Sequence, residues 1–212
     1  MLASIPKPQD PELIRYEEEK RREHQQKIDT YLVIMAESNI PKRHNLFESS
    51  SSTDPEWDKK YCYMKERLNK RGIFIFCGPR GTGKTQMTAC LMKVFVKSNL
   101  LSAKYCSIMD IFIALKATYN GEGKEHEVLH SFVRPALLVI DECHERSESK
   151  WENTMFTHLI DKRYACHKLC TILISNLMPD ALLASLGASI LDRANETGGV
   201  VAFDNVRNFR SN

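Results

Sequence analysis

Short apolar runs and helical patterns alternate along most of the chain. The predicted strands lie at 73–77, 103–107, 136–140, 171–175 and 200–203. The predicted helices lie at 57–69, 86–97, 111–118 and 152–164. Apolar runs without polar alternation are typical of parallel strands that are buried on both faces. The chain is therefore predicted to form an α/β domain in which helices cover a parallel sheet.

An additional helix is predicted at 11–37, before this domain. Opposite charges four residues apart, such as Glu17 and Arg21, are typical of a solvated helix. Farther along, one helical face carries the apolar residues Ile28, Tyr31, Leu32 and Met35. Two interpretations stay open: the end of this helix packs on its own domain, or its apolar face lies in the groove of a partner.

Composition narrows the class of protein. The 212 residues are 42% hydrophobic and 27% charged, which is typical of a globular chain. The net charge of +3 is too small to indicate nucleic-acid binding by itself. The first residues contain no apolar signal-peptide core, and every apolar run is shorter than a membrane span. Because the seven cysteines are scattered, we expect a cytoplasmic protein with reduced thiols and no membrane partner.

The segment at 78–85 matches the phosphate-binding pattern G-x-x-x-x-G-K-[ST] in full. It follows a predicted strand and opens a predicted helix, where backbone N–H groups and the helix N-terminus can hold phosphates. Lys84 is expected to reach the β- and γ-phosphates, and the Thr85 hydroxyl is expected to bind Mg²⁺. The residues predicted to bind the nucleotide are Gly78, Pro79, Arg80, Gly81, Thr82, Gly83, Lys84, Thr85 and Gln86.

Polar residues follow two further predicted strands. Asp141 and Glu142 end an apolar run, and in proteins with this phosphate loop such an aspartate holds Mg²⁺. Glu142 is expected to activate the attacking water as a general base, which favours hydrolysis over transfer to a bound metabolite. Asn176 is expected to place its amide beside the γ-phosphate; the alternative is an Asx turn before Pro179.

Together these motifs resemble those of the bacterial DnaC-type helicase loaders and the IstB-like ATP-binding proteins of transposons, which are AAA+ ATPases. The resemblance covers about residues 36–206 and rests on the segments 39–43, 78–85, 138–142, 159–164, 171–177 and 190–193. It implies a five-stranded parallel sheet in the order 5-1-4-3-2, flanked by helices. It also implies an ATPase domain at 37–212 and an N-terminal helical extension at 1–36 that can dock a partner.

The same resemblance implies ATP sites that are shared between subunits and completed by an arginine from the neighbour. Arg193 is the first choice for this arginine and Arg163 the second. Ser189 stands where some family members carry another arginine. The segment at 40–43 is implied to lie near the adenine.

The expected protein is an ATP- and Mg²⁺-dependent ATPase, weak alone, that helps to load a replicative helicase onto single-stranded DNA and can form ATP-dependent homo-oligomers. Lys84, Glu142, Asn176 and Arg193 are its predicted catalytic residues, with Thr85 and Asp141 at the metal. Two alternatives share these residues. One is a transposition ATPase that delivers a transposase to target DNA, and the other is a nucleotide-gated module that occupies a host helicase with little hydrolysis.

Overall fold

The computed structural model describes residues 11–147 and 149–209. Its centre is a five-stranded sheet in which paired strands are parallel, in the order β2-β3-β4-β1-β5. The strands are β1 (Gly72–Cys77), β2 (Ala103–Ser107), β3 (Leu137–Asp141), β4 (Cys170–Ile174) and β5 (Gly199–Ala202). The predicted fold class and strand order are confirmed, and the predicted strand ends differ from these by at most one residue.

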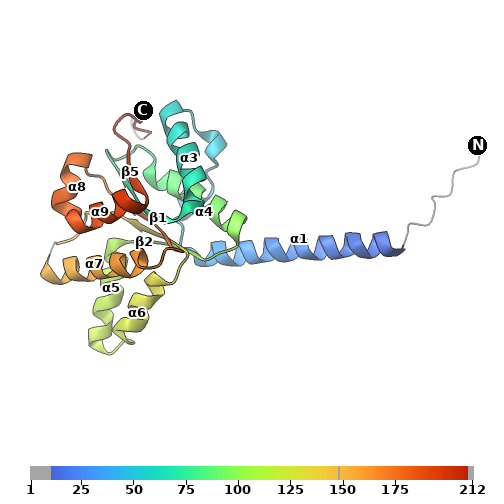
Figure 1. Ribbon diagram of the computed structural model, residues 1–212, viewed down its shortest axis with the longest axis horizontal. Coiled ribbons are helices and arrows are strands. Elements are labelled where there is room, and N and C mark those ends of the chain that lie inside the picture. The colour runs from blue at the N-terminus through green and yellow to red at the C-terminus, as the bar shows by residue number, and fades with distance from the viewer. Residues whose placement is uncertain (1–10, 148, 210–212) are drawn as a thin grey trace, which may run out of the picture.

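Helices cover both faces of the sheet (Figure 1). They are α1 (Pro11–Glu37), α2 (Lys42–Asn45), α3 (Pro55–Arg67), α4 (Lys84–Asn99), α5 (Ile108–Ala117), α6 (Glu125–Val133), α7 (Lys150–Tyr164), α8 (Pro179–Leu186) and α9 (Ala188–Thr197). In β1, Ile73 and Ile75 join one buried cluster with residues of α5, α7 and α9. Phe74 and Phe76 join a second cluster with residues of α3 and α4. Because both faces are buried, every position of the strand interior is apolar.

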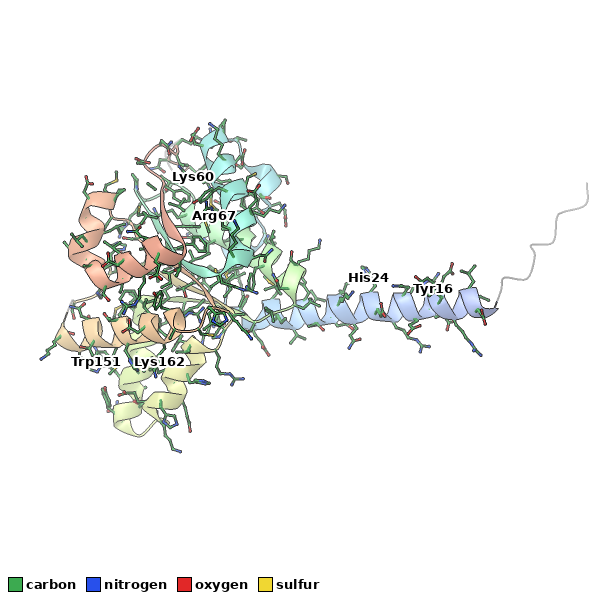
Figure 2. All side chains as sticks on the ribbon, viewed as in Figure 1. Tyr16, His24, Lys60, Arg67, Trp151 and Lys162 are labelled. Carbon is green, nitrogen blue, oxygen red and sulfur yellow. The ribbon has the colours of Figure 1, made fainter. Side chains whose placement is uncertain are left out.

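Helix α1 is packed at its C-terminal end and projects from the domain over the rest of its length (Figure 1). Tyr31, Ile34 and Met35 pack against the second cluster, and the carbonyl oxygen of Ser38, just after the helix, accepts a hydrogen bond from the Tyr105 backbone at 2.7 Å. Tyr16 remains 58% exposed and extends into solvent with its neighbours (Figure 2). The interpretation that the helix end packs on its own domain therefore accounts for only part of the helix.

Local capping decides where two of the helices begin. The Asp54 side chain accepts hydrogen bonds from the backbones of Glu56 and Trp57 at 2.9 and 3.0 Å, which starts α3 two residues before the predicted position. Ser107 and Asp110 form a capping box that starts α5 at Ile108.

Four of the described helices have no counterpart in the sequence prediction: α2, α6, α8 and α9. The polar segment after α5 contains Gly121 and Gly123, and α6 begins directly after it at Glu125. Within the two described stretches, no helix is long and apolar enough to cross a membrane.

Candidate active site

The loop between β1 and α4 surrounds the ammonium group of Lys84. Its Nζ atom donates to the carbonyl oxygens of Gly78 and Pro79, each at 2.7 Å, and the residue is 4% exposed. Gly83 precedes α4 with a φ of +78°, in the left-handed region. A Cβ atom at this position would lie 2.8 Å from Nε1 of Trp57. Backbone conformation and available space therefore both require glycine at 83.

Three distant segments hold this loop from outside. Trp57 of α3 donates from Nε1 to the carbonyl oxygen of Gly83 at 3.3 Å. The backbone N–H of Phe209 donates to the carbonyl oxygen of Gly81 at 2.9 Å, and that of Gly78 donates to Leu177 at 2.8 Å. The loop is thus fixed by tertiary contacts as well as by its own sequence.

The carboxylate of Asp141 lies directly beside the start of α4. Its Oδ2 accepts a hydrogen bond from Thr85 Oγ1 at 2.9 Å and another from the hydroxyl of Tyr105. Its Oδ1 accepts from the backbone of Glu142 at 2.7 Å. Mg²⁺ prefers oxygen ligands, so the paired hydroxyl and carboxylate of Thr85 and Asp141 fit this ion.

Tyr105 was not predicted as a site residue. Burial raises the pKa of its hydroxyl, and the neighbouring Asp141 carboxylate raises it further, so Tyr105 remains protonated and acts as a donor. The sequence offered no signal for this role, because an aromatic residue on a strand is usually part of the core.

Glu142 follows β3 with a φ of +53°, so the chain turns sharply where the predicted general base stands. Its side chain is partly open to solvent and partly covered. Partial burial raises the pKa of this carboxyl, and the charges of Glu145 and Asp141 add to the effect. A carboxylate with a raised pKa is a stronger base, which suits proton abstraction from water.

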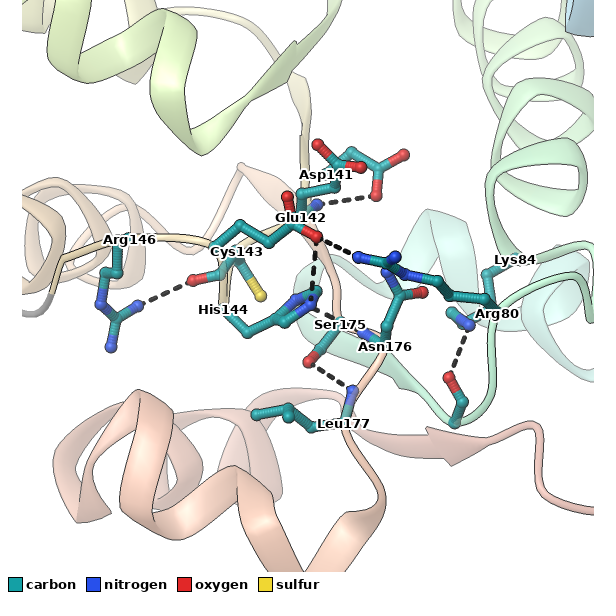
Figure 3. A network of polar contacts seen from close by, with 12 residues as sticks. Arg80, Lys84, Asp141, Glu142, Cys143, His144, Arg146, Ser175, Asn176 and Leu177 are labelled. Atoms are coloured by element: carbon teal, nitrogen blue, oxygen red, sulfur yellow. Dashed lines mark hydrogen bonds and ion pairs between the residues drawn. The ribbon is translucent and has the colours of Figure 1, made fainter.

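A chain of polar contacts links the loop after β3 to the phosphate-binding loop (Figure 3). Arg80 pairs with Glu145 at 2.5 Å, and Glu145 lies 3.7 Å from Nε2 of His144. Nδ1 of His144 accepts from the backbone N–H of Asn176 at 3.4 Å. Burial lowers the pKa of His144, which favours the neutral imidazole that this acceptor role needs. Neither His144 nor Glu145 was predicted to belong to the site.

A cavity of about 520 Å³ lies between these groups, within the usual size range of small-molecule sites. It is lined by Arg43, His44, Arg80, Gly81, Gly83, Lys84, Thr85, Gln86, Asp141, Glu142, Glu145, Asn176 and Phe209. The structure therefore brings together the predicted phosphate, metal, water and amide residues. Arg43, from the segment expected near the adenine, lines the same cavity. Thr82 lies behind it and donates to the carbonyl oxygen of Pro79 at 2.9 Å.

The two arginines considered for a role across subunits differ in their surroundings. Arg163 is 1% exposed and donates to several groups of the domain interior, so it is a core residue. Arg193 pairs with Asp161 at 2.9 Å, donates to the carbonyl oxygen of Ser189, and lies over the ring of Tyr164. It does not line the cavity of its own chain.

Comparison with known proteins gives consistent matches. The family described as IstB-like ATP binding protein matches residues 14–205. The replicative helicase loader DnaC of Escherichia coli K12 is 28% identical over 150 residues, which are 70% of this chain and 60% of that relative. A crystal structure of the DnaC helicase loader superposes with a TM-score of 0.65 at 18% identity, covering 79% of this chain and all of the other. A replication initiator DnaA, bound to AMPPCP and single-stranded DNA, gives a TM-score of 0.62 at 19% identity, covering 78% of this chain and 51% of the other.

Proposed function

The chain belongs to the family of IstB-like ATP binding proteins, within the AAA+ ATPases, and on this premise we propose that it binds ATP with Mg²⁺ and hydrolyses it. The observation that carries the proposal is the meeting of Lys84, Thr85 and Asp141 around one cavity, with the Thr85–Asp141 contact at 2.9 Å. An ammonium, a hydroxyl and a carboxylate in this order suit a triphosphate and its divalent cation.

Each residue has a defined task in this proposal. Lys84 moves its donors from loop carbonyls to the β- and γ-phosphate oxygens, and Thr85 and Asp141 hold Mg²⁺. When bound, Mg²⁺ would supply positive charge that offsets the charge of the phosphates. Tyr105 keeps Asp141 oriented through its hydroxyl. Asn176 lines the same cavity, and its amide can donate to the γ-phosphate.

Glu142 acts on the water. Its carboxylate accepts a proton while the water oxygen bonds to the γ-phosphorus, and the bond from that phosphorus to the β-γ bridging oxygen breaks. The products are ADP and inorganic phosphate, and the proton on Glu142 returns to solvent. The raised pKa of Glu142 makes it a better proton acceptor than an ordinary glutamate.

We propose loading of a replicative helicase onto single-stranded DNA as the biological role. The similarity to DnaC loaders supports it. The chain spans 60% of the length of that DnaC relative, so the partner is inferred from part of a protein only. In this role ATP-bound subunits assemble, and Arg193 of one subunit completes the site of the next.

Two variants test the chemistry. Glu142→Gln keeps the shape and removes the base, so it is expected to bind ATP with Mg²⁺ as wild type does and to lose turnover by about 100-fold or more. Lys84→Ala removes the phosphate counter-charge and is expected to lose binding itself. Glu66→Gln is the matched control, because it makes the same change at an exposed carboxylate of α3 that does not line the cavity. Fluorescent-nucleotide titration and phosphate release measure the two steps. Wild-type turnover by Glu142→Gln would show that another group activates the water.

Copurification tests the partner. We expect a replicative helicase to copurify with this chain in the presence of ATP and to dissociate when the ATP is hydrolysed. The family match to IstB-like proteins also favours a transposition role, and retention of a transposase in place of the helicase would establish that alternative. Retention of a helicase without turnover, even with single-stranded DNA present, would establish a binding module.

We further propose that the projecting part of α1 docks the partner. Removing residues 1–27 deletes this part and keeps Tyr31, Ile34 and Met35, which pack on the domain. Deleting the whole extension 1–36 would also remove these packed residues, so a loss of partner binding could not be distinguished from a loss of domain stability. Undiminished helicase binding by the shorter truncation would exclude this role for α1.

A further inference from the structure

The segment Asn205–Phe209 lies across the outside of the phosphate-binding loop. Phe209 donates its backbone N–H to the carbonyl oxygen of Gly81 at 2.9 Å. Arg207 donates its backbone N–H to Oδ2 of Asp54 at 3.0 Å, and the Asn205 side chain donates to Glu56 at 3.1 Å. The segment is thus tied to both the loop and the start of α3. It lies almost wholly beyond residue 205, where the family match ends.

The cavity is larger than the group of residues that suits phosphates, metal and water, which are Lys84, Thr85, Asp141 and Glu142. Nine further residues line it. Three of them, Arg43 and His44 of α2 and Phe209, come from segments outside the phosphate-binding loop, α4 and the loops after β3 and β4. These three side chains are available to the nucleoside part of a nucleotide whose phosphates lie at the loop.

Phe209 is the aromatic side chain among the residues that line the cavity. One edge of its ring faces Gly83, because a Cβ atom at Gly83 would lie 3.2 Å from Cε2 of Phe209. The ring packs against the buried cluster that contains Trp57, a residue that is 1% exposed. The guanidinium of Arg207 lies over the ring, 5.0 Å from its centroid. The ring is still only partly buried, so the surface that Arg207 does not cover can contact a ligand. A supported, partly exposed ring is well suited to contact a planar base.

We propose that Phe209 forms one wall of the compartment for the nucleobase and that the segment Asn205–Phe209 holds it there. This inference rests on the proposed ATP binding and adds a residue that positions the base. Base stacking on an aromatic ring depends little on which base is present. Phe209 therefore contributes affinity for nucleoside phosphates in general, and its contribution does not extend to the phosphates themselves.

The test compares Phe209→Leu with Phe209→Trp in the full chain. Leucine keeps apolar bulk against Trp57 and removes the aromatic face, and tryptophan keeps an aromatic face. Tyr16→Leu is the control, because it removes an exposed aromatic side chain on α1, far from the cavity (Figure 2). Calorimetric titration measures the affinities for ATP with Mg²⁺ and for inorganic tripolyphosphate with Mg²⁺, and thermal melting checks that each variant is folded.

We expect Phe209→Leu to weaken ATP binding by roughly tenfold and to leave tripolyphosphate binding within about twofold of wild type. Phe209→Trp and Tyr16→Leu should retain ATP affinity. Equal loss for ATP and tripolyphosphate would overturn the inference, because Phe209 would then act by shaping the loop. Unchanged ATP affinity in Phe209→Leu would overturn it as well. If the wild-type chain bound tripolyphosphate and ATP equally well, the base compartment would be refuted while phosphate binding stood; if it bound neither, the proposed function itself would fail.

Discussion

Replacement of Arg163 is predicted to destabilise the domain strongly while acting nowhere near the cavity. The guanidinium connects α7 to the segment before β3 and to β4. Its acceptors are Thr171 Oγ1 and the carbonyl oxygens of Phe132, Val133, Pro135 and Cys170. Burial lowers the pKa of this arginine to about 10, and it remains charged at neutral pH. This side chain of α7 therefore satisfies acceptors from two other parts of the chain, residues 132–135 and 170–171.

The size of the effect follows from these acceptors. A buried acceptor that loses its donor costs about 1 kcal/mol or more. Because Arg163→Ala leaves five such acceptors without their donor, the loss is roughly 5 kcal/mol if nothing else in the domain moves. Water entering the space recovers part of this. We expect the free energy of unfolding to fall by about 3–5 kcal/mol, a large share of the ~5–15 kcal/mol typical of a domain. Arg163→Lys supplies three donors and should lose about half as much.

Urea denaturation followed by circular dichroism measures the change. With a slope of roughly 2–3 kcal/mol per molar urea, Arg163→Ala should lower the midpoint by about 1–2 M, and Arg163→Lys by less. The reasoning would be refuted if Arg163→Ala kept the wild-type midpoint and lost only ATP turnover. That result is what an arginine acting across a subunit boundary would give.

Two further predictions concern titratable side chains. Under native conditions, Ellman's reagent should modify the exposed thiol of Cys62 rapidly and the half-buried thiol of Cys166 slowly. The other five of the seven thiols should react only after unfolding, because they are buried and burial raises the pKa of Cys106, Cys143 and Cys170 to about 12. Fast reaction of more than two thiols in the folded protein would contradict this prediction. The pKa of His144 is lowered in the folded chain. Below about pH 6.5 the unfolded chain therefore binds more protons than the folded chain. The free energy of unfolding should fall as the pH drops through that value. Urea midpoints at pH 7.5, 6.5 and 5.5 should show a smaller fall for His144→Asn, and identical pH dependence in both proteins would rule out His144 as the cause.

The elements most fully predicted from sequence are those whose signal is local. The end of β3 at Asp141 is visible in the sequence, because an apolar run is followed there by two charged residues. The loop before Lys84 is visible too, because its spacing of glycine residues and lysine is specific to one backbone conformation. The strand order came from family resemblance, because no local pattern states which strands are neighbours. Helices α8 and α9 were missed: they are short, and their helical faces are completed by packing against each other and the sheet.

The site residues that were missed depend on contacts between distant parts of the chain. Tyr105 reaches Asp141 across two paired strands. His144 meets Asn176 because the ends of β3 and β4 are adjacent in the sheet. Phe209 lies beside Gly81 only after the chain has returned from β5. Their residue types carry no distinctive motif, so three-dimensional proximity is the only evidence for their roles.

The position of β1 in the sheet sets the order in which a ribosome can complete this site. β1 pairs with β4 from Cys170 onward and with β5 from Gly199 onward, and with neither β2 nor β3. The strand that carries the phosphate-binding loop is thus synthesised well before both of its hydrogen-bonded neighbours. In a nascent chain this apolar strand stays unpaired until β4 and β5 have emerged, so the chain can bind a nucleotide in this site only after that point.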